Sequence, residues 1–148
     1  MSGDEPYTEH VGAVLVLLVL AGLVAVPWLT VRAAIGLVRA RRAGTALLGP
    51  AALLAWGAAA AAYTWGLLQL LFFDDYAQAE ACAKAVDGRV AGYEPAFVPL
   101  GFGCRAADGS VTEAVIPPWV NPATLLFGIG ALVLTWFAIA HHKKGHHS

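Results

Sequence analysis

Charged residues are scarce in this sequence, and they are missing altogether from three long stretches. Only 13% of the 148 residues are Asp, Glu, Lys or Arg, and 59% are hydrophobic, whereas a soluble domain has about 25% charged residues. The deficit is concentrated in these stretches, which excludes an ordinary soluble domain and indicates a membrane protein. No basic patch exceeds what membrane-flanking segments need, so we expect no nucleic-acid partner.

The residue patterns that accompany catalysis are also missing. The sequence has no Gly-rich phosphate loop, no zinc motif and no serine in a nucleophile elbow. Its two cysteines lie far apart and form no Cys-x-x-Cys pair, which argues against thiol–disulfide catalysis. No ionisable residue lies inside an apolar stretch, where such residues mark ion pathways. The sequence therefore favours a protein without enzymatic activity, and we predict no cofactor and no metal site.

Each of the three uncharged stretches is long enough to cross a bilayer as a helix. About 20 consecutive apolar residues suffice to span the hydrocarbon core. Asn121 and Pro122 suit the start of the third stretch, since Asn is a favoured N-cap residue and Pro is tolerated in the first turn. The predicted transmembrane helices are residues 11–31, 47–73 and 121–140.

Small residues recur at four-residue spacing within the second span, and they predict close helix packing. Small side chains let two helix backbones approach closely inside a membrane. The alternative is compositional bias, because alanine is frequent throughout the chain. The two rows are Ala51, Ala55 and Ala59, and Ala58, Ala62 and Gly66.

Positive charges predict how the chain is oriented, because Lys and Arg accumulate on the cytoplasmic side of a membrane. Segment 32–46 carries four arginines and segment 141–148 two lysines, while segment 1–10 carries neither residue type. We therefore predict an extracytoplasmic N-terminus, a cytoplasmic segment 32–46, an extracytoplasmic segment 74–120 and a cytoplasmic C-terminus. An anionic-lipid site is the alternative interpretation of the four arginines. The predicted topogenic residues are Arg32, Arg39, Arg41, Arg42, Lys143 and Lys144.

The C-terminal segment 141–148 reads HHKKGHHS. We interpret it as a solvated, disordered tail whose lysines act in the orientation signal. The alternative is binding of a transition metal by its two histidine pairs. Adjacent histidines on a flexible end do not preorganise such a site, so the tail interpretation is favoured.

Segment 74–120, which we call the cap, is the one long segment that is neither strongly apolar nor terminal. It contains both cysteines, Cys82 and Cys104. On an oxidising outer side we predict that they form a disulfide. Closing a loop of about 23 residues stabilises the folded chain by about 3 kcal/mol in the chain-entropy model.

The local pattern of the cap predicts one helical extension and one β-hairpin. Residues 74–86 are rich in helix formers, so the second span is expected to continue as one long helix carrying Cys82. Residues 97–105 and 110–116 are typical of strands, and Asp108-Gly109 suits the turn between them. The predicted fold class is a membrane all-α protein: three transmembrane helices with a small, disulfide-stapled, extracytoplasmic α+β cap.

Four aromatic or aliphatic residues between the cysteines are candidate contacts for a partner. An exposed apolar patch often marks a protein–protein contact. Two alternatives are open: the residues form a small core beneath the disulfide, or they rest on the membrane surface. The four residues are Tyr93, Phe97, Leu100 and Phe102.

The outer segment also carries a resemblance. Its pattern of Cys82, Tyr93, Pro99-Leu100, Cys104 and Asp108-Gly109, in an alanine-rich chain, resembles that of small, uncharacterised integral membrane proteins of actinobacteria. The resemblance implies a membrane protein and assigns neither a function nor a functional residue.

Three functions are compatible with these features. The favoured one is a non-enzymatic accessory or scaffold subunit, or an oligomer, which offers the cap to a protein partner while membrane lipids surround its helices. The second is an oligomeric channel or transporter lined by the second span. The third is a membrane enzyme that acts on a lipid or quinone at the outer interface, using Asp74, Asp75 or Tyr76.

Overall fold

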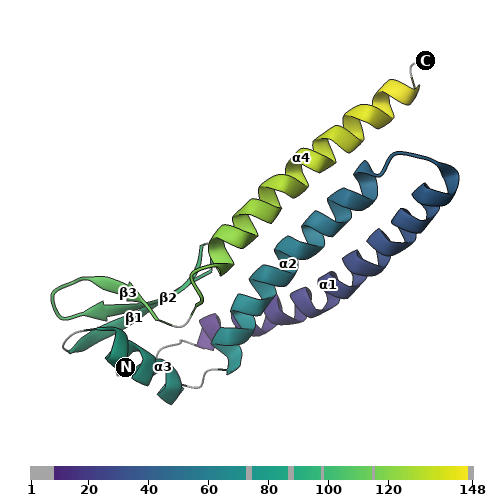
Figure 1. Ribbon diagram of the computed structural model, residues 1–148. Helices are drawn as coiled ribbons and strands as arrows, with labels where there is room; N and C mark the ends of the chain where they lie inside the picture. The colour runs from purple at the N-terminus through teal and green to yellow at the C-terminus, as the bar shows by residue number, and fades with distance from the viewer. Residues whose placement is uncertain (1–8, 73–74, 87–88, 98, 115, 147–148) are drawn as a thin grey trace. The chain divides into compact units, whose positions relative to one another are not determined.

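The structure, a computed structural model, describes residues 9–72, 75–86, 89–97, 99–114 and 116–146. The chain divides into two compact units, which we describe separately. The cap unit comprises residues 1–20 and 63–121, and the helical unit comprises residues 21–62 and 122–148. The elements in chain order are helices α1 (Glu9–Ala43), α2 (Leu48–Phe72) and α3 (Asp75–Ala85), strands β1 (Val90–Phe97), β2 (Leu100–Ala106) and β3 (Val111–Glu113), and helix α4 (Val120–His146) (Figure 1).

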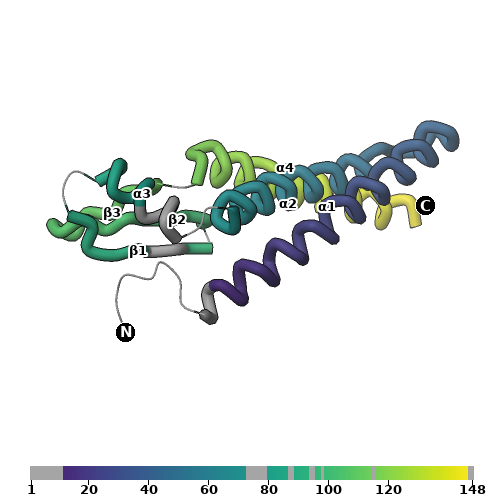
Figure 2. Tube along the Cα trace, turned by 90° about the horizontal axis from the view of Figure 1, so that it is seen from below, coloured from purple at the N-terminus to yellow at the C-terminus, as the bar shows by residue number. Residues whose placement is uncertain are grey.

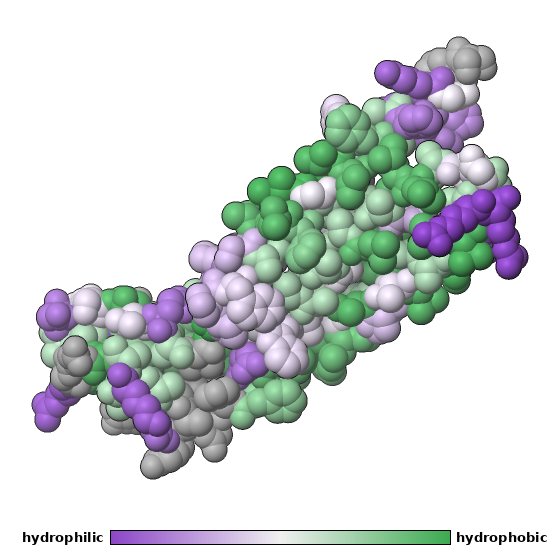
Figure 3. All heavy atoms as spheres, in the orientation of Figure 1, coloured by the Kyte–Doolittle hydropathy of each residue, from purple (hydrophilic) through white to green (hydrophobic). Residues whose placement is uncertain are grey.

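Helices α1, α2 and α4 are long and apolar enough to cross a membrane. The 25 residues of α2 extend over about 37 Å at 1.5 Å per residue, more than the hydrocarbon thickness of about 30 Å. Figure 3 shows hydrophobic side chains along the visible face of the helical unit and hydrophilic ones at the ends of its helices. The prediction of three candidate membrane helices is confirmed.

The arginine-rich segment is helical rather than a loop. Helix α1 continues through Ala43, so all four arginines lie on its last turns. Gly44 then adopts a positive φ of 63°, and the backbone N–H of Thr45 donates to the carbonyl oxygen of Ala40 at 3.0 Å. This pairing is the Schellman motif, in which a left-handed glycine ends a helix.

Helix α4 is longer than the predicted third span, residues 121–140. Helix α4 begins at Val120, one residue before Asn121, and it continues through His146. The predicted disordered tail is therefore wrong for residues 141–146. The segment between Ala131 and Lys144 contains no Gly or Pro to stop the helix. Lys143 and Lys144 also interact favourably with the negative end of the helix dipole.

The cap contains a three-stranded antiparallel sheet in the order β1-β2-β3. The turn between β2 and β3 is the predicted one: Gly109 has a φ of 90°, and its N–H donates to the carbonyl oxygen of Ala106 at 3.0 Å. The predicted hairpin is thus confirmed in shorter form. Helix α3 lies against one face of the sheet (Figures 1 and 2).

Two features of the cap differ from prediction. Strand β1 was not among the predicted strands, and it is an edge strand, where Pro95 removes no ladder bond that the sheet needs. The structure also shows α2 and α3 as separate helices rather than one continuous helix. The described part of α3 begins at Asp75, and residues 73–74 lie outside the described residues.

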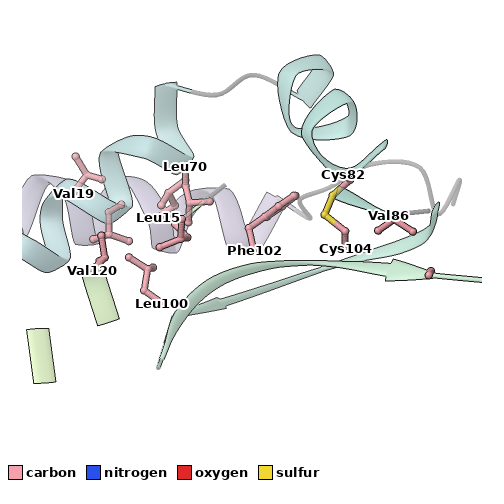
Figure 4. Packing of buried hydrophobic residues seen from close by; sticks show 12 residues of the cluster. Leu15, Val19, Leu70, Cys82, Val86, Leu100, Phe102, Cys104 and Val120 are labelled. Atoms are coloured by element: carbon pink, nitrogen blue, oxygen red, sulfur yellow. A yellow bond between two sulfur atoms is a disulfide. The ribbon is translucent and has the colours of Figure 1, made fainter. Parts of the chain in front are cut away.

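The core of the cap unit joins the sheet to parts of helices α1, α2, α3 and α4. Alternate residues of β2 point to the same face, and Leu100, Phe102 and Cys104 on that face are all buried. They pack with Cys82 of α3 and with Val86, which directly follows that helix (Figure 4). The other members of this core come from the first half of α1, the end of α2, the end of β2, the segment before α4 and the first residue of α4: Leu15, Val19, Leu67, Leu70, Ala106, Ile116 and Val120.

The helical unit is built on close approaches of small residues. A Cβ atom added to Gly57 would lie 3.7 Å from the Cβ of Leu29, and one added to Gly36 would lie 3.2 Å from Pro50 Cγ. Helix α4 is bonded to α2 by the indole N–H of Trp56, which donates to the Thr135 hydroxyl at 3.1 Å. Small residues therefore mark the contact between α1 and α2.

Candidate functional site

The cap is closed by the predicted disulfide. Cys82 of α3 and Cys104 of β2 are bonded, with their Cα atoms 5.4 Å apart. Both cysteines are fully buried, and the described residues contain no free cysteine. The bond therefore fixes the helix to the central strand of the sheet, and its burial protects it from thiols in solution.

Two polar side chains hold the connection between β1 and β2. Tyr63 of α2 donates its hydroxyl hydrogen to the carbonyl oxygen of Phe97 at 2.6 Å. Asn121 of α4 accepts from the N–H of Leu100 at 3.0 Å and donates to the carbonyl oxygen of the same residue at 2.6 Å. The Asn121 amide thus acts as a substitute strand partner for one residue, a role that differs from the predicted helix cap.

Gly66 provides the third attachment of the same hairpin. A Cβ atom at this position would overlap Leu100 Cδ2 and would lie 2.9 Å from Val120 Cγ1. The hairpin therefore packs directly on the backbone of α2, and only glycine leaves room for it. Gly66 was predicted to serve contacts between helices, and its described neighbours include a strand residue of the cap.

The second hairpin is shaped by carboxylates. Glu113 accepts from the N–H of Phe102 at 3.2 Å. Asp108 accepts from the backbone N–H of Ser110 at 2.9 Å and from its hydroxyl at 2.7 Å. These hydrogen bonds from Ser110 hold the pKa of the Asp108 carboxyl below its usual range. Asp108 therefore stays ionised and keeps the turn closed at neutral pH.

The outward side of the cap is polar with a small apolar element. Glu80 and Lys84 form an exposed ion pair at 2.9 Å on α3, which contributes little to stability in solvent. Strand β3 is exposed along its whole length, and Val111 is 51% exposed. Strand β1 carries a register irregularity after Val90 and a proline, features that hinder pairing with another strand. The β1 edge is therefore poorly suited to accept a further strand.

The four predicted partner-contact residues divide into two groups. Leu100 and Phe102 are buried in the core of the cap unit, so the core alternative holds for them. Tyr93 and Phe97 are partly buried against that core. Tyr93 stacks on Phe102 with ring centroids 5.8 Å apart. The physical reason is that a sheet of three strands has too few apolar residues to fill a core without its aromatic ones.

Only some of the predicted packing residues of α2 are buried. Ala59 and Ala62 are buried, whereas Ala51, Ala55 and Ala58 are half-buried. Gly57, which belongs to neither predicted row, makes the close approach to α1.

Groups for catalysis or metal binding do not assemble in the described part of the chain. No cluster of three or more His, Cys, Asp or Glu residues is present among the described residues. His142 and His146 lie edge to face on α4 with ring centroids 4.7 Å apart. Asp74 lies outside the described residues, as do the side chains of Asp75 and Tyr76.

Comparisons of the chain with protein-family models, with curated proteins and with solved structures give no match. Function is therefore inferred from the chain's own residues.

Proposed function

We propose that this protein is a non-enzymatic membrane protein, an accessory or scaffold subunit, which holds the cap on the extracytoplasmic side for a protein partner or a second copy of the chain. Helices α1, α2 and α4 span the bilayer in this proposal, surrounded by membrane lipids. The N-terminus is extracytoplasmic, and the C-terminus is cytoplasmic.

The distribution of charge within the helical unit supports this orientation. The loop after α1 and the end of α4 are neighbours, because Thr45, Ala46, His141 and His142 line one open hollow of about 590 Å³. The arginines at the end of α1 and the lysines at the end of α4 therefore gather at one end of the unit. The positive-inside rule assigns such an end to the cytoplasm.

The observation that carries the proposal is the rigid attachment of the cap. The disulfide, the hydrogen bonds of Tyr63 and Asn121, and the packing at Gly66 are three independent restraints on β1 and β2. A surface that is ordered before binding loses less conformational entropy when a partner docks. A cap held this firmly is suited to recognition, because its side chains keep fixed positions.

Site-specific photo-crosslinking in native membranes tests the proposal. A photoreactive residue at Val111, exposed on β3, should yield a discrete adduct with a second polypeptide chain. The same residue at Val24, 70% exposed on α1, is the matched control and should react with lipid. A protein that runs as a strict monomer in mild detergent and forms no protein adduct from Val111 would contradict the proposal.

A further inference from the structure

An open groove of about 360 Å³ lies along the inner part of α1, within the helical unit. Gly36 lines this groove, carries no Cβ atom and lies close to Pro50 of α2. Arg32 and Arg39 are the charged residues of its lining, and the remaining lining residues are apolar. The lining residues used in the argument are Trp28, Val31, Arg32, Ile35, Arg39 and Leu53.

The positive charge of the groove is not balanced by any acidic residue of the same unit. Segments 21–62 and 122–148 contain no Asp and no Glu, but they contain all four arginines of the cluster. Arg32 and Arg39 therefore face the groove with no carboxylate of the same unit to neutralise them. Guanidinium groups near a low-dielectric surface attract an anion from outside, because solvent screens them less there than in bulk water.

The spacing of the two arginines fits the polar layer of a bilayer. Arg32 directly follows the uncharged stretch of α1, so it lies where the hydrocarbon ends. Arg39 is seven residues further along the same helix, about 10.5 Å at 1.5 Å per residue. This distance is somewhat larger than the depth of one headgroup layer, about 5–7.5 Å. Both arginines have long, flexible side chains, so a headgroup between them is within reach of both.

The apolar lining fits an acyl chain. Trp28, Val31 and Ile35 are 54%, 57% and 44% exposed, and Leu53 of α2 lines the opposite side. The guanidinium carbon of Arg32 lies 5.2 Å from the centroid of the Trp28 ring. Stacking on the ring holds the arginine in place and leaves its remaining N–H groups directed to an acceptor.

We propose that this groove binds one anionic phospholipid, with its phosphate between Arg32 and Arg39 and one acyl chain against Val31 and Ile35. The inference does not depend on the cap or its partner. It assigns different roles to the arginines, because Arg41 and Arg42 do not line the groove. They remain part of the charge that orients the chain.

Native mass spectrometry of the full chain in a neutral detergent tests the site. The protein is titrated with phosphatidylglycerol or with phosphatidylcholine of the same acyl chains. The wild type should retain one phosphatidylglycerol and release phosphatidylcholine. Arg32→Gln with Arg39→Gln should weaken phosphatidylglycerol retention about tenfold or more, since charge-assisted hydrogen bonds are lost. Arg41→Gln with Arg42→Gln removes the same charge and should change retention by less than about twofold.

A third variant keeps the test decisive if the double arginine variant does not fold. Leu53→Trp retains every arginine and fills the groove from α2, so it should also release phosphatidylglycerol. Equal losses in both arginine pairs would overturn the proposal, because charge alone would then explain retention. Unchanged retention in Leu53→Trp would overturn it as well. Glycerol phosphate at millimolar concentration should not displace the lipid, and efficient displacement would show that no acyl contact contributes.

Discussion

Replacing Gly66 by alanine tests how closely the cap packs on α2. The new Cβ would overlap Leu100 and would lie 2.9 Å from Val120 Cγ1. Leu100 is 1% exposed and Val120 is fully buried, so neither side chain has space to move away. Val120 is also β-branched, which restricts its χ1 angle in the helix.

Gly57→Ala in the same helix is the matched control. Its Cβ would lie 3.7 Å from the Leu29 Cβ, an ordinary van der Waals contact. Both substitutions gain about 1 kcal/mol of helix propensity, so this gain cancels in the comparison. Overpacking costs about 1–3 kcal/mol and applies at Gly66 alone. We therefore expect Gly66→Ala to be less stable than Gly57→Ala by about 1–3 kcal/mol.

Thermal unfolding in detergent, followed by circular dichroism, measures the difference. It should amount to about 2–4 °C in Tm per kcal/mol for a chain of this size. Hydrogen exchange of the Leu100 amide, which donates to Asn121, locates the effect and should accelerate in Gly66→Ala only. Equal stability of the two variants, with unchanged exchange at Leu100, would refute close packing of the hairpin on α2.

Three further predictions concern the cap. Cys82→Ser should lower the free energy of unfolding by about 3 kcal/mol, measured by denaturation, while a control in which the wild type is first reduced in denaturant, where the disulfide is exposed, should abolish the difference between the two proteins. Tyr63→Phe removes the hydrogen bond to β1 at 2.6 Å and should cost about 1 kcal/mol, with faster exchange in β1 and β2. The hydrogen bonds from Ser110 lower the pKa of Asp108 from its usual 3.8. The stabilisation of the turn should thus be complete above that value and be lost as the pH falls through the lowered pKa, and NMR titration should show no such step in Asp108→Asn.

The three helices and the disulfide could be predicted because each rests on a strong local or compositional signal. An uncharged stretch the length of α2 has few stable alternatives to a helix. Two cysteines allow a single pairing. Asp108-Gly109 specifies a turn through the backbone angle that Gly109 adopts.

The parts that were wrong depend on tertiary position, which local patterns do not encode. Residues 90–96 were not predicted as a strand, and Pro95 is tolerated there because β1 is at the edge of the sheet. The role of Asn121 is decided by Leu100, a residue distant in sequence that lies beside it only in the folded chain. Helix α4 extends through His146 because a polar composition does not itself end a helix. Gly66 was predicted to pack against another helix, but the sequence pattern did not show that Leu100 of β2 is its neighbour.

The orientation of the cap is the claim on which the proposed function rests, and cysteine accessibility measures it directly. Both native cysteines are bonded and buried, so an added cysteine is the reactive one. Ala107→Cys lies in the exposed turn after β2, and Thr45→Cys lies in the exposed loop after α1. In intact cells a membrane-impermeant maleimide should label Ala107→Cys at once and Thr45→Cys only after permeabilisation. Labelling of Thr45→Cys alone in intact cells would contradict the account.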